Sequence, residues 1–455
     1  MMSGKQAASL YQVQAAHPQR YPFLLESVAH GPVQARYDIL LAFPGDRLEL
    51  SGDGVLRLNQ ELLEGQAFLP TFDECWKRQG GAGRESANGL PFSGGWFVYI
   101  GYEMADQIEP GLRLVNRPGF PKALAVRIPA AIIFDHQTRQ ITCFTEDGHP
   151  AMQDQMRLDL ETAPDIPASP GFNIAMREDD GDLFLRDVER IKRYIREGDV
   201  FQVNLSRLWK GSLERERGML SEKVTALDLY RSLRRSNPGP FNGLALLSDT
   251  QAVVSSSPER LVNVRGGRVS VRPIAGTYPR GLTTEQDRIL SEQLTRHPKE
   301  KAEHIMLIDL ERNDLGRICQ PGSVKVDELM SVETYKHVHH IVSEVSGRLQ
   351  TGIGPADVIR AVFPGGTITG CPKVRCMEII AELEQAWRGP YTGSMGYINH
   401  NGDMDLNILI RSMVMDGDQL SFRAGGGIVH DSIPHRELEE TRAKARGMVR
   451  GLQVA

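Results

Sequence analysis

Glycine, proline and acidic turn residues divide the first third of the chain into short apolar runs. These runs include YDILLAF, GWFVYIGYE, LAVRIPAAIIFD and QITCFTE, and none continues long enough for a regular helix. Short runs rich in β-branched and aromatic residues, bounded by turn residues, are typical of strands. Residues 1–145 are therefore predicted to form an N-terminal lobe rich in sheet.

The chain changes character after this lobe. Residues 146–175 are polar and contain several prolines, which predicts a connector. The segment DLFLRDVERIKRYIREGD then places apolar residues at helical spacing and ends at Gly198, a helix stop signal. KEKAEHIMLIDLERND is compatible with either a strand or a helix. Further helices are predicted at 221–236, 284–297, 356–363, 373–384 and 435–452, among strands such as FNGLALL and QLSFRAGGGIV.

Helices and strands in residues 176–455 do not alternate as regular βαβ units. The prediction is therefore an α+β fold and not a doubly wound parallel sheet. The 455 residues carry 53 basic and 58 acidic side chains, an even balance that argues against a nucleic-acid-coating protein. Five irregularly spaced cysteines and the lack of an apolar signal segment predict reduced thiols and a cytoplasmic location.

A run of three glycines near the C-terminus is the first candidate binding element. Gly425, Gly426 and Gly427 lie in RAGGGIVHDSIP, where bare backbone could present N–H groups to an anion or simply form a turn. The chain lacks the GxxxxGK[ST] and GxGxxG patterns of nucleotide sites, so a carboxylate is the favoured anion.

Charged residues follow this run in the sequence. Glu437, Glu440 and Lys444 follow at steps of three and four, which places them on one helix face. Such a pattern is also common on solvated helices. Together with Glu303 these carboxylates would suit a hard cation such as Mg²⁺. The histidines at 337, 339 and 340 lack cysteine or aspartate partners at zinc-ligand spacing, so a structural or acid/base function is favoured for them.

Taken in order, many segments of this chain resemble the chorismate-utilising enzymes. The resemblance covers about residue 180 to the C-terminus, and its matching segments are GDVFQVNLS, SSSPERLV, RPIAGTYPRG, EHIMLIDLERNDLGR, VHHIVSEV, FPGGTITGCPKVRCMEII, YTGSMGYI, ILIRS, AGGGIV and EETRAKA. It implies a two-layer antiparallel β-sandwich flanked by helices, with residues 176–455 binding chorismate and Mg²⁺.

The resemblance also implies functions for individual residues. Glu259 matches the acid that protonates the departing C4 hydroxyl, and His340 matches the histidine near C2. The positions that match metal ligands are Glu303 and Glu440, with Glu437 acting through water. Those that match substrate-binding groups are Gly276, Thr277, Thr367, Tyr391, Arg411, Gly425, Gly426, Gly427 and Lys444.

Two positions bear on which reaction is catalysed. Members that use water have lysine where this chain has Gln202, so the resemblance implies amination, with ammonia supplied by a separate glutaminase subunit. PFNGLAL, QVNLS, FPGGTITGCPK, HVHH and ARYDILLAFP resemble component I of aminodeoxychorismate synthase. Ala275, however, stands where many of those enzymes have a lysine nucleophile, and anthranilate synthases have alanine there. Aminodeoxychorismate synthase is the favoured prediction, and anthranilate synthase component I is the alternative.

Two further hypotheses concern binding. FLLES, with Leu25, Glu26 and Ser27, resembles an element of a tryptophan pocket in this family, although the same residues would suit an ordinary strand. A non-catalytic subunit that binds tryptophan or a partner is the alternative from another class. Retention of Glu259, Glu303, His340, Arg411, Glu440 and Lys444 argues against it.

Overall fold

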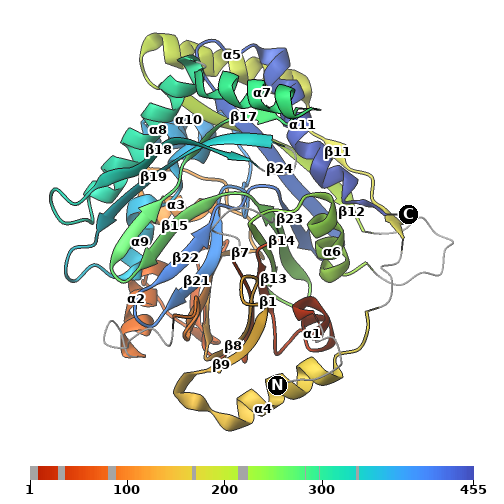
Figure 1. The fold of residues 1–455 in the computed structure, drawn as a ribbon. Helices are drawn as coiled ribbons and strands as arrows, with labels where there is room; N and C mark the ends of the chain where they lie inside the picture. The colour runs from red at the N-terminus through yellow and green to blue at the C-terminus, as the bar shows by residue number, and fades with distance from the viewer. Residues whose placement is uncertain are drawn as a thin grey trace.

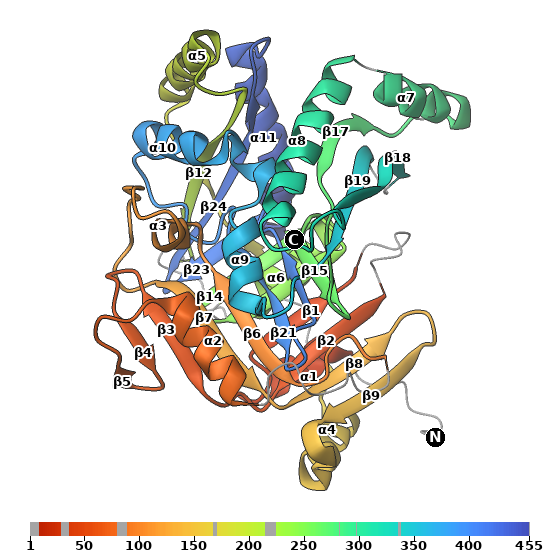
Figure 2. The ribbon, with the colours of Figure 1, turned by 90° about the vertical axis from the view of Figure 1, so that its left-hand side faces the viewer.

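Two large antiparallel sheets pack face to face and are covered by helices on their outer sides. The computed structural model describes residues 9–28, 36–79, 89–166, 171–213, 224–281, 283–296, 298–334 and 338–454. Figures 1 and 2 show the sheets in the middle of the molecule, with α4 at one end and α5, α8, α10 and α11 at the other. The helices are α1 (Leu10–Ala16), α2 (Phe68–Arg78), α3 (Ala105–Ile108), α4 (Pro150–Thr162), α5 (Gly181–Glu197), α6 (Ala226–Ser236), α7 (Thr284–Arg296), α8 (Pro298–Gly316), α9 (Pro355–Val362), α10 (Lys373–Glu384) and α11 (Pro434–Arg450).

The first sheet runs from the C-terminal half of the chain into the N-terminal lobe. Every strand pair in it is antiparallel. Its order is β11 (Arg177–Glu178), β12 (Gln202–Ser212), β24 (Gln419–Ile428), β23 (Ser412–Asp416), β14 (Gln251–Ser257), β13 (Phe241–Leu246), β1 (Phe23–Glu26), β2 (Tyr37–Ala42), β8 (Ala130–Asp135) and β9 (Gln140–Thr145), with β20 (Gly370–Cys371) beside β12.

The second sheet mixes the two halves of the chain in the same way, and a short pair joins the C-terminus to the segment after α4. The sheet order is β17 (Ile274–Pro279), β19 (Val338–Arg348), β16 (Arg268–Val271), β15 (Arg260–Arg265), β22 (Met404–Asn407), β21 (Ser394–Asn399), β6 (Gly95–Ile100), β7 (Pro121–Ile128), β3 (Arg47–Ser51), β4 (Leu56–Leu58) and β5 (Glu61–Leu62), with β18 (Lys325–Thr334) beside β19. The separate pair is β10 (Phe172–Asn173) with β25 (Gln453–Val454).

Apolar side chains fill the space between the sheets and beneath the helices. Phe23 of the first sheet stacks on Phe97 of the second, with ring centroids 3.7 Å apart. A second buried cluster lies under α2 and α9 on the outer face of the second sheet, and a third lies under α1, α4, α6 and α11 on the first. The α+β prediction of a two-layer antiparallel sandwich flanked by helices is confirmed.

The three-part division at residues 145 and 175 describes the chain but not separate bodies in space. β1 pairs with β13, and β6 pairs with β21, so strands of residues 1–145 complete both sheets of residues 176–455. The connector also contains α4, a helix of 13 residues, where the sequence indicated only a polar link. Interstrand pairs between residues more than two hundred positions apart leave no mark on local sequence pattern, which explains the difference.

The candidate site depends most on the long pair β12–β24. Ten residues of each strand are in register, from Val203 opposite Ile428 to Ser212 opposite Gln419. α10 contacts β12, and α11 contacts β24. Near them, the 3₁₀ turn η4 (Gly366–Ile368) contacts both α8 and β24. This arrangement brings four distant segments of the chain around the glycine run.

Candidate functional site

The three glycines lie within β24 and allow other groups to approach its backbone. A Cβ at Gly425 would lie 2.4 Å from the Leu205 carbonyl oxygen and 2.8 Å from the Tyr391 hydroxyl. A Cβ at Gly427 would lie 2.2 Å from the Gln202 side-chain nitrogen. Since real Cβ atoms do not come so close to other heavy atoms, any larger residue would displace Tyr391 or Gln202. The glycines are therefore required for close packing and not for a turn.

Helix α11 brings a lysine and a carboxylate to the same run. The Lys444 Nζ donates to the Gly425 carbonyl oxygen at 2.9 Å and forms an ion pair with Glu440 Oε1 at 2.8 Å. A Cβ at Gly426 would lie 3.3 Å from this Nζ. Both side chains are about half exposed, so they remain accessible to a ligand. Lys444 and the glycine run therefore lie side by side, and their binding of substrate remains a prediction.

Glu259 is a buried carboxyl group held by one short hydrogen bond. The Thr367 hydroxyl of η4 donates to Glu259 Oε1 at 2.6 Å. Burial raises the pKa of Glu259 to about 7, against the lowering effects of Thr367, Arg411 and Lys444. A carboxyl group with a pKa near neutrality can donate a proton at physiological pH. The resemblance predicts an acid function for Glu259, which remains a prediction.

Arg411 faces the same region without a bonded partner. It has a φ of 51°, and its side chain makes no hydrogen bond or ion pair with the residues that the structure describes. Burial lowers its pKa, although the Glu259 carboxylate opposes this shift. A desolvated guanidinium is costly unless an anion neutralises it. Arg411 is therefore suited to bind an anionic ligand beside Glu259.

His340 lies on β19 against the strand that carries Ala275, Gly276 and Thr277. Its Nδ1 is 3.4 Å from the Gly276 carbonyl oxygen, and the register shifts between Ala275 and Thr277, where Gly276 has a φ of 71°. Burial, with the neighbouring Arg411, lowers the pKa of His340 to about 4, so its imidazole is neutral at physiological pH. The side chains of Ala275 and Thr277 lie outside the described part of the structure, as does His337.

The predicted metal ligands lie on two helices. Glu303 is partly buried on α8, while Glu437 and Glu440 are on α11. Within the described ranges, no three His, Cys, Asp or Glu side chains gather closely enough to hold a metal ion. The magnesium assignment therefore remains a prediction, and the ion pair with Lys444 is the contact that Glu440 makes here.

Comparison with known proteins places this geometry in a family. Residues 56–450 match the chorismate binding enzyme family. The chain belongs to this family. Aminodeoxychorismate synthase component 1 of Bacillus subtilis (strain 168) is 40% identical over 80% of this chain and 78% of its own. Anthranilate synthase component 1 of Pseudomonas putida is 37% identical over 98% of this chain and 92% of its own.

A solved structure of the same family shares the fold. Anthranilate synthase component I from Streptococcus pneumoniae TIGR4 matches with a TM-score of 0.80 and 32% identity, and the match covers 92% of this chain and 93% of that one. The relatives thus bear both names, which shows the family but does not decide between the two reactions. No helix among the described residues is long and apolar enough to cross a membrane.

The residues predicted for a tryptophan pocket line a cavity between the two sheets. Leu25, Glu26 and Ser27 border this cavity, whose interior measures about 80 Å³. The Glu26 carboxylate accepts from the Tyr230 hydroxyl and from Arg234 Nε, and burial raises its pKa. A cavity thus lies beside these residues, and the tryptophan pocket remains a prediction. The cavity is also lined by Tyr37, Pro240, Phe241, Asn242, Met395, Tyr397 and Asp405.

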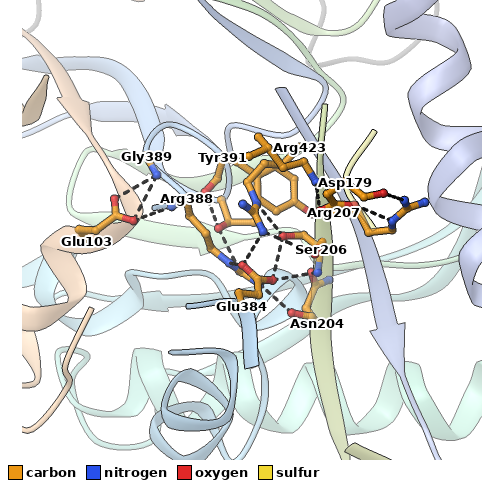
Figure 3. A network of polar contacts seen from close by, with 12 residues as sticks. Glu103, Asp179, Asn204, Ser206, Arg207, Glu384, Arg388, Gly389, Tyr391 and Arg423 are labelled. Carbon is orange, nitrogen blue, oxygen red and sulfur yellow. Dashed lines mark hydrogen bonds and ion pairs between the residues drawn. The ribbon is translucent and has the colours of Figure 1, made fainter. Parts of the chain in front are cut away.

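Sequence reasoning missed a buried network of charged residues behind the glycine run (Figure 3). Glu384 at the end of α10 pairs with Arg388 at 2.6 Å and with Arg423 of β24 at 2.9 Å. Glu103 accepts from the backbone N–H groups of Arg388 and Gly389. Glu384 and Arg388 are four apart, a spacing that signals a pair, but such pairs are usually exposed. Their burial depends on tertiary contacts.

Proposed function

We propose that this chain is component I of an aminodeoxychorismate synthase, which converts chorismate and ammonia to 4-amino-4-deoxychorismate. The observation that carries amination is Gln202, whose side-chain amide packs against Gly427 where water-using relatives are expected to carry a basic lysine. Water needs a base to become a nucleophile, whereas ammonia does not. A separate glutaminase subunit would supply the ammonia.

Each group of side chains in the site would serve a different part of the reaction. Arg411, Tyr391, Lys444 and the backbone of the glycine run would hold the two substrate carboxylates, because guanidinium, ammonium and N–H groups all stabilise anions. Glu259, protonated below about pH 7, would give its proton to the C4 hydroxyl as the C4–O bond breaks. Neutral His340 would lie near C2. Without a lysine at position 275, ammonia or water would form the first bond to C2 while the C4 hydroxyl leaves as water. A further ammonia would then form the bond to C4 as the group on C2 leaves, which gives the 4-amino product.

The carboxylates of Glu303, Glu437 and Glu440 suit a magnesium ion by their chemistry. Magnesium prefers oxygen ligands and usually keeps water or substrate oxygens in its shell. Glu440 is about half exposed and already accepts a cationic group, the Lys444 ammonium. When bound, Mg²⁺ would neutralise negative charge on the substrate.

A second candidate is component I of anthranilate synthase. Ala275 favours it, since anthranilate synthases have alanine at that position. Several relatives that match most of this chain also bear that name. In this reaction ammonia also attacks C2, but pyruvate is then eliminated and the ring becomes aromatic.

A product assay separates the two candidates. Purified chain, chorismate, Mg²⁺ and an ammonium salt are expected to yield no fluorescent anthranilate and no pyruvate. 4-Aminobenzoate is expected only after aminodeoxychorismate lyase is added. Release of anthranilate with pyruvate would replace the proposal by the second candidate, and no turnover by either route would favour a non-catalytic subunit. Intact-mass spectrometry during turnover is expected to show no covalent adduct, and an adduct on any lysine would contradict the direct attack by ammonia.

Substitution of Thr367 by valine is expected to move the alkaline limb of the pH dependence of kcat/KM to higher pH. The Thr367 hydroxyl lowers the pKa of Glu259, so its loss raises that pKa and keeps the acid protonated at higher pH. Loss of one hydrogen bond to a catalytic group should also lower kcat/KM at neutral pH about tenfold. The assay varies pH while free ammonia is held constant.

A neighbouring threonine supplies the control for this experiment. The buried Thr369 hydroxyl donates to the Gly365 carbonyl oxygen at 2.8 Å and does not contact Glu259. Thr369→Val should therefore leave the alkaline limb in place. If Thr367→Val also leaves it in place, Glu259 is not the acid that sets this limb.

A further inference from the structure

Arg423 is a buried arginine with part of its guanidinium unpaired. Its Nε donates to Ser206 Oγ at 2.9 Å, and its Nη2 donates to Glu384 Oε2 at 2.9 Å. The residue is only 5% exposed, and its buried Nη1 has no hydrogen-bond partner among the described residues. Buried polar groups are rarely left unsatisfied, and each exception needs a reason.

Both carboxylate oxygens of Glu384 accept hydrogen bonds from the groups around it. It accepts from Ser206 N and Oγ, from Arg388 Nε and Nη2, and from Arg423 Nη2, all between 2.6 and 2.9 Å. One carboxylate therefore faces two guanidinium groups, which leaves one positive charge in excess among these three side chains. Figure 3 shows Tyr391 beside this network. The Arg388 guanidinium lies 5.6 Å from the Tyr391 ring centroid and 4.7 Å from that of Tyr102.

The network contacts the glycine run through Ser206 of β12. Ser206, which binds both Arg423 and Glu384, is in register with Gly425. A Cβ at Gly425 would meet the Ser206 Cβ and the Tyr391 hydroxyl, each at 2.8 Å. Burial raises the pKa of Tyr391 to about 12, while Arg388 and Arg423 act to lower it. Tyr391 is therefore within electrostatic reach of the Arg423 charge.

We propose that Arg423 is a positioning residue of the carboxylate-binding site. It fixes β24 at Gly425 through Ser206, holds Tyr391 through the shared network, and places its own positive charge near the backbone that receives a substrate carboxylate. This inference rests on the proposed function, in which Tyr391 and the glycine run bind chorismate. The Arg423 charge would act on the bound and reacting forms of the substrate alike, so it belongs to binding and not to the chemical step.

The test compares Arg423→Gln with Arg423→Lys by calorimetric titration of chorismate and by steady-state kinetics. Arg423→Gln is expected to raise the Kd and KM for chorismate about tenfold, as expected for one partly screened charge, with kcat within about threefold of wild type. Arg423→Lys keeps the charge and should restore Kd and KM to within about threefold of wild type.

Arg207 offers a matched control. It is buried on β12, pairs with Asp179 and is in register with Ala424, so it lies outside the set that contacts Glu384. Arg207→Gln should cost stability but leave the chorismate Kd unchanged. If Arg423→Gln does not fold, Ser206→Ala replaces it, and a raised chorismate Kd is expected because Arg423 loses its Nε acceptor.

The outcomes separate the two proposals. Wild-type protein that fails to bind chorismate would overturn the proposed function. Wild-type protein that binds chorismate, with an unchanged Kd in Arg423→Gln or Ser206→Ala, would overturn only the inference about Arg423. Equal losses in Arg423→Lys and Arg423→Gln would also overturn it, since the charge would then not matter.

Discussion

Glu259→Gln is expected to lower kcat/KM about a thousandfold, because it removes the proton that the proposed reaction delivers to the departing hydroxyl. Glutamine keeps the size of the side chain and can still accept the hydrogen bond from Thr367. The fall in kcat/KM would therefore result from loss of the acidic proton and not from a change of packing. The measurement is ammonia-dependent turnover of chorismate at constant free ammonia, with product formation followed after addition of the lyase.

The pH dependence of wild-type protein supports the same test. With a pKa of about 7, Glu259 is protonated below neutral pH, so wild-type kcat/KM should fall as pH rises through 7. The raised pKa also means that the folded state binds this proton more tightly than the unfolded state, and the stability that it contributes is lost as pH rises through 7. Glu259→Gln should accordingly melt at the same temperature as wild type or higher at pH 8, which excludes unfolding as the cause of lost activity.

Glu311 provides the control for Glu259. It is a buried carboxyl group on α8, burial raises its pKa to about 8, and it borders Gly366 of η4. It is not among the groups proposed to bind substrate or to donate a proton, so Glu311→Gln should keep activity within about tenfold of wild type. Equal losses in Glu259→Gln and Glu311→Gln would show that any buried carboxyl near η4 matters, and the assignment of Glu259 as the acid would be wrong.

Local patterns in the sequence predicted local structure well. The helix after the connector ends where predicted, at Gly198, which adopts a φ of 84° that favours glycine. α10 has the predicted bounds, Lys373–Glu384. α8 was ambiguous between strand and helix because polarity does not follow burial along it: His304, Glu311 and Asp314 are buried, whereas Ile305 is exposed. A helix that buries polar side chains lacks the apolar periodicity by which helices are recognised.

The site could be predicted in its parts but not in its assembly. Glu259, Thr367 and Lys444 were identified through the resemblance, and the structure brings them to η4 and the glycine run. The adjacent histidines do not form one cluster, because neighbouring residues of a strand point to opposite sides: His339 binds Asp287, while His340 faces Gly276. The pairing of Glu384 with Arg423 spans 39 residues, and no local spacing predicts it.

Glu440→Gln is the second prediction with a large expected effect, about a thousandfold loss of kcat/KM (roughly 4 kcal/mol) at a fixed magnesium concentration. Glutamine can still accept a hydrogen bond from Lys444, so this contact within α11 survives. The negative charge of the proposed metal ligand is lost. Mg²⁺ affinity, measured by calorimetry in the presence of chorismate, should fall at least about a hundredfold, and excess Mg²⁺ should restore part of the activity.

Glu439 is the matched control for Glu440, because it is the preceding residue of α11 and pairs at the surface with Arg442. Glu439→Gln should leave both Mg²⁺ affinity and turnover unchanged, since an exposed ion pair contributes little. If Glu440→Gln behaves like Glu439→Gln in both measurements, the carboxylate of Glu440 serves only to hold Lys444, and the magnesium assignment is wrong. If Mg²⁺ affinity falls in Glu440→Gln but not in a Glu303→Gln variant, the metal is held by α11 alone, and α8 contributes no ligand to it.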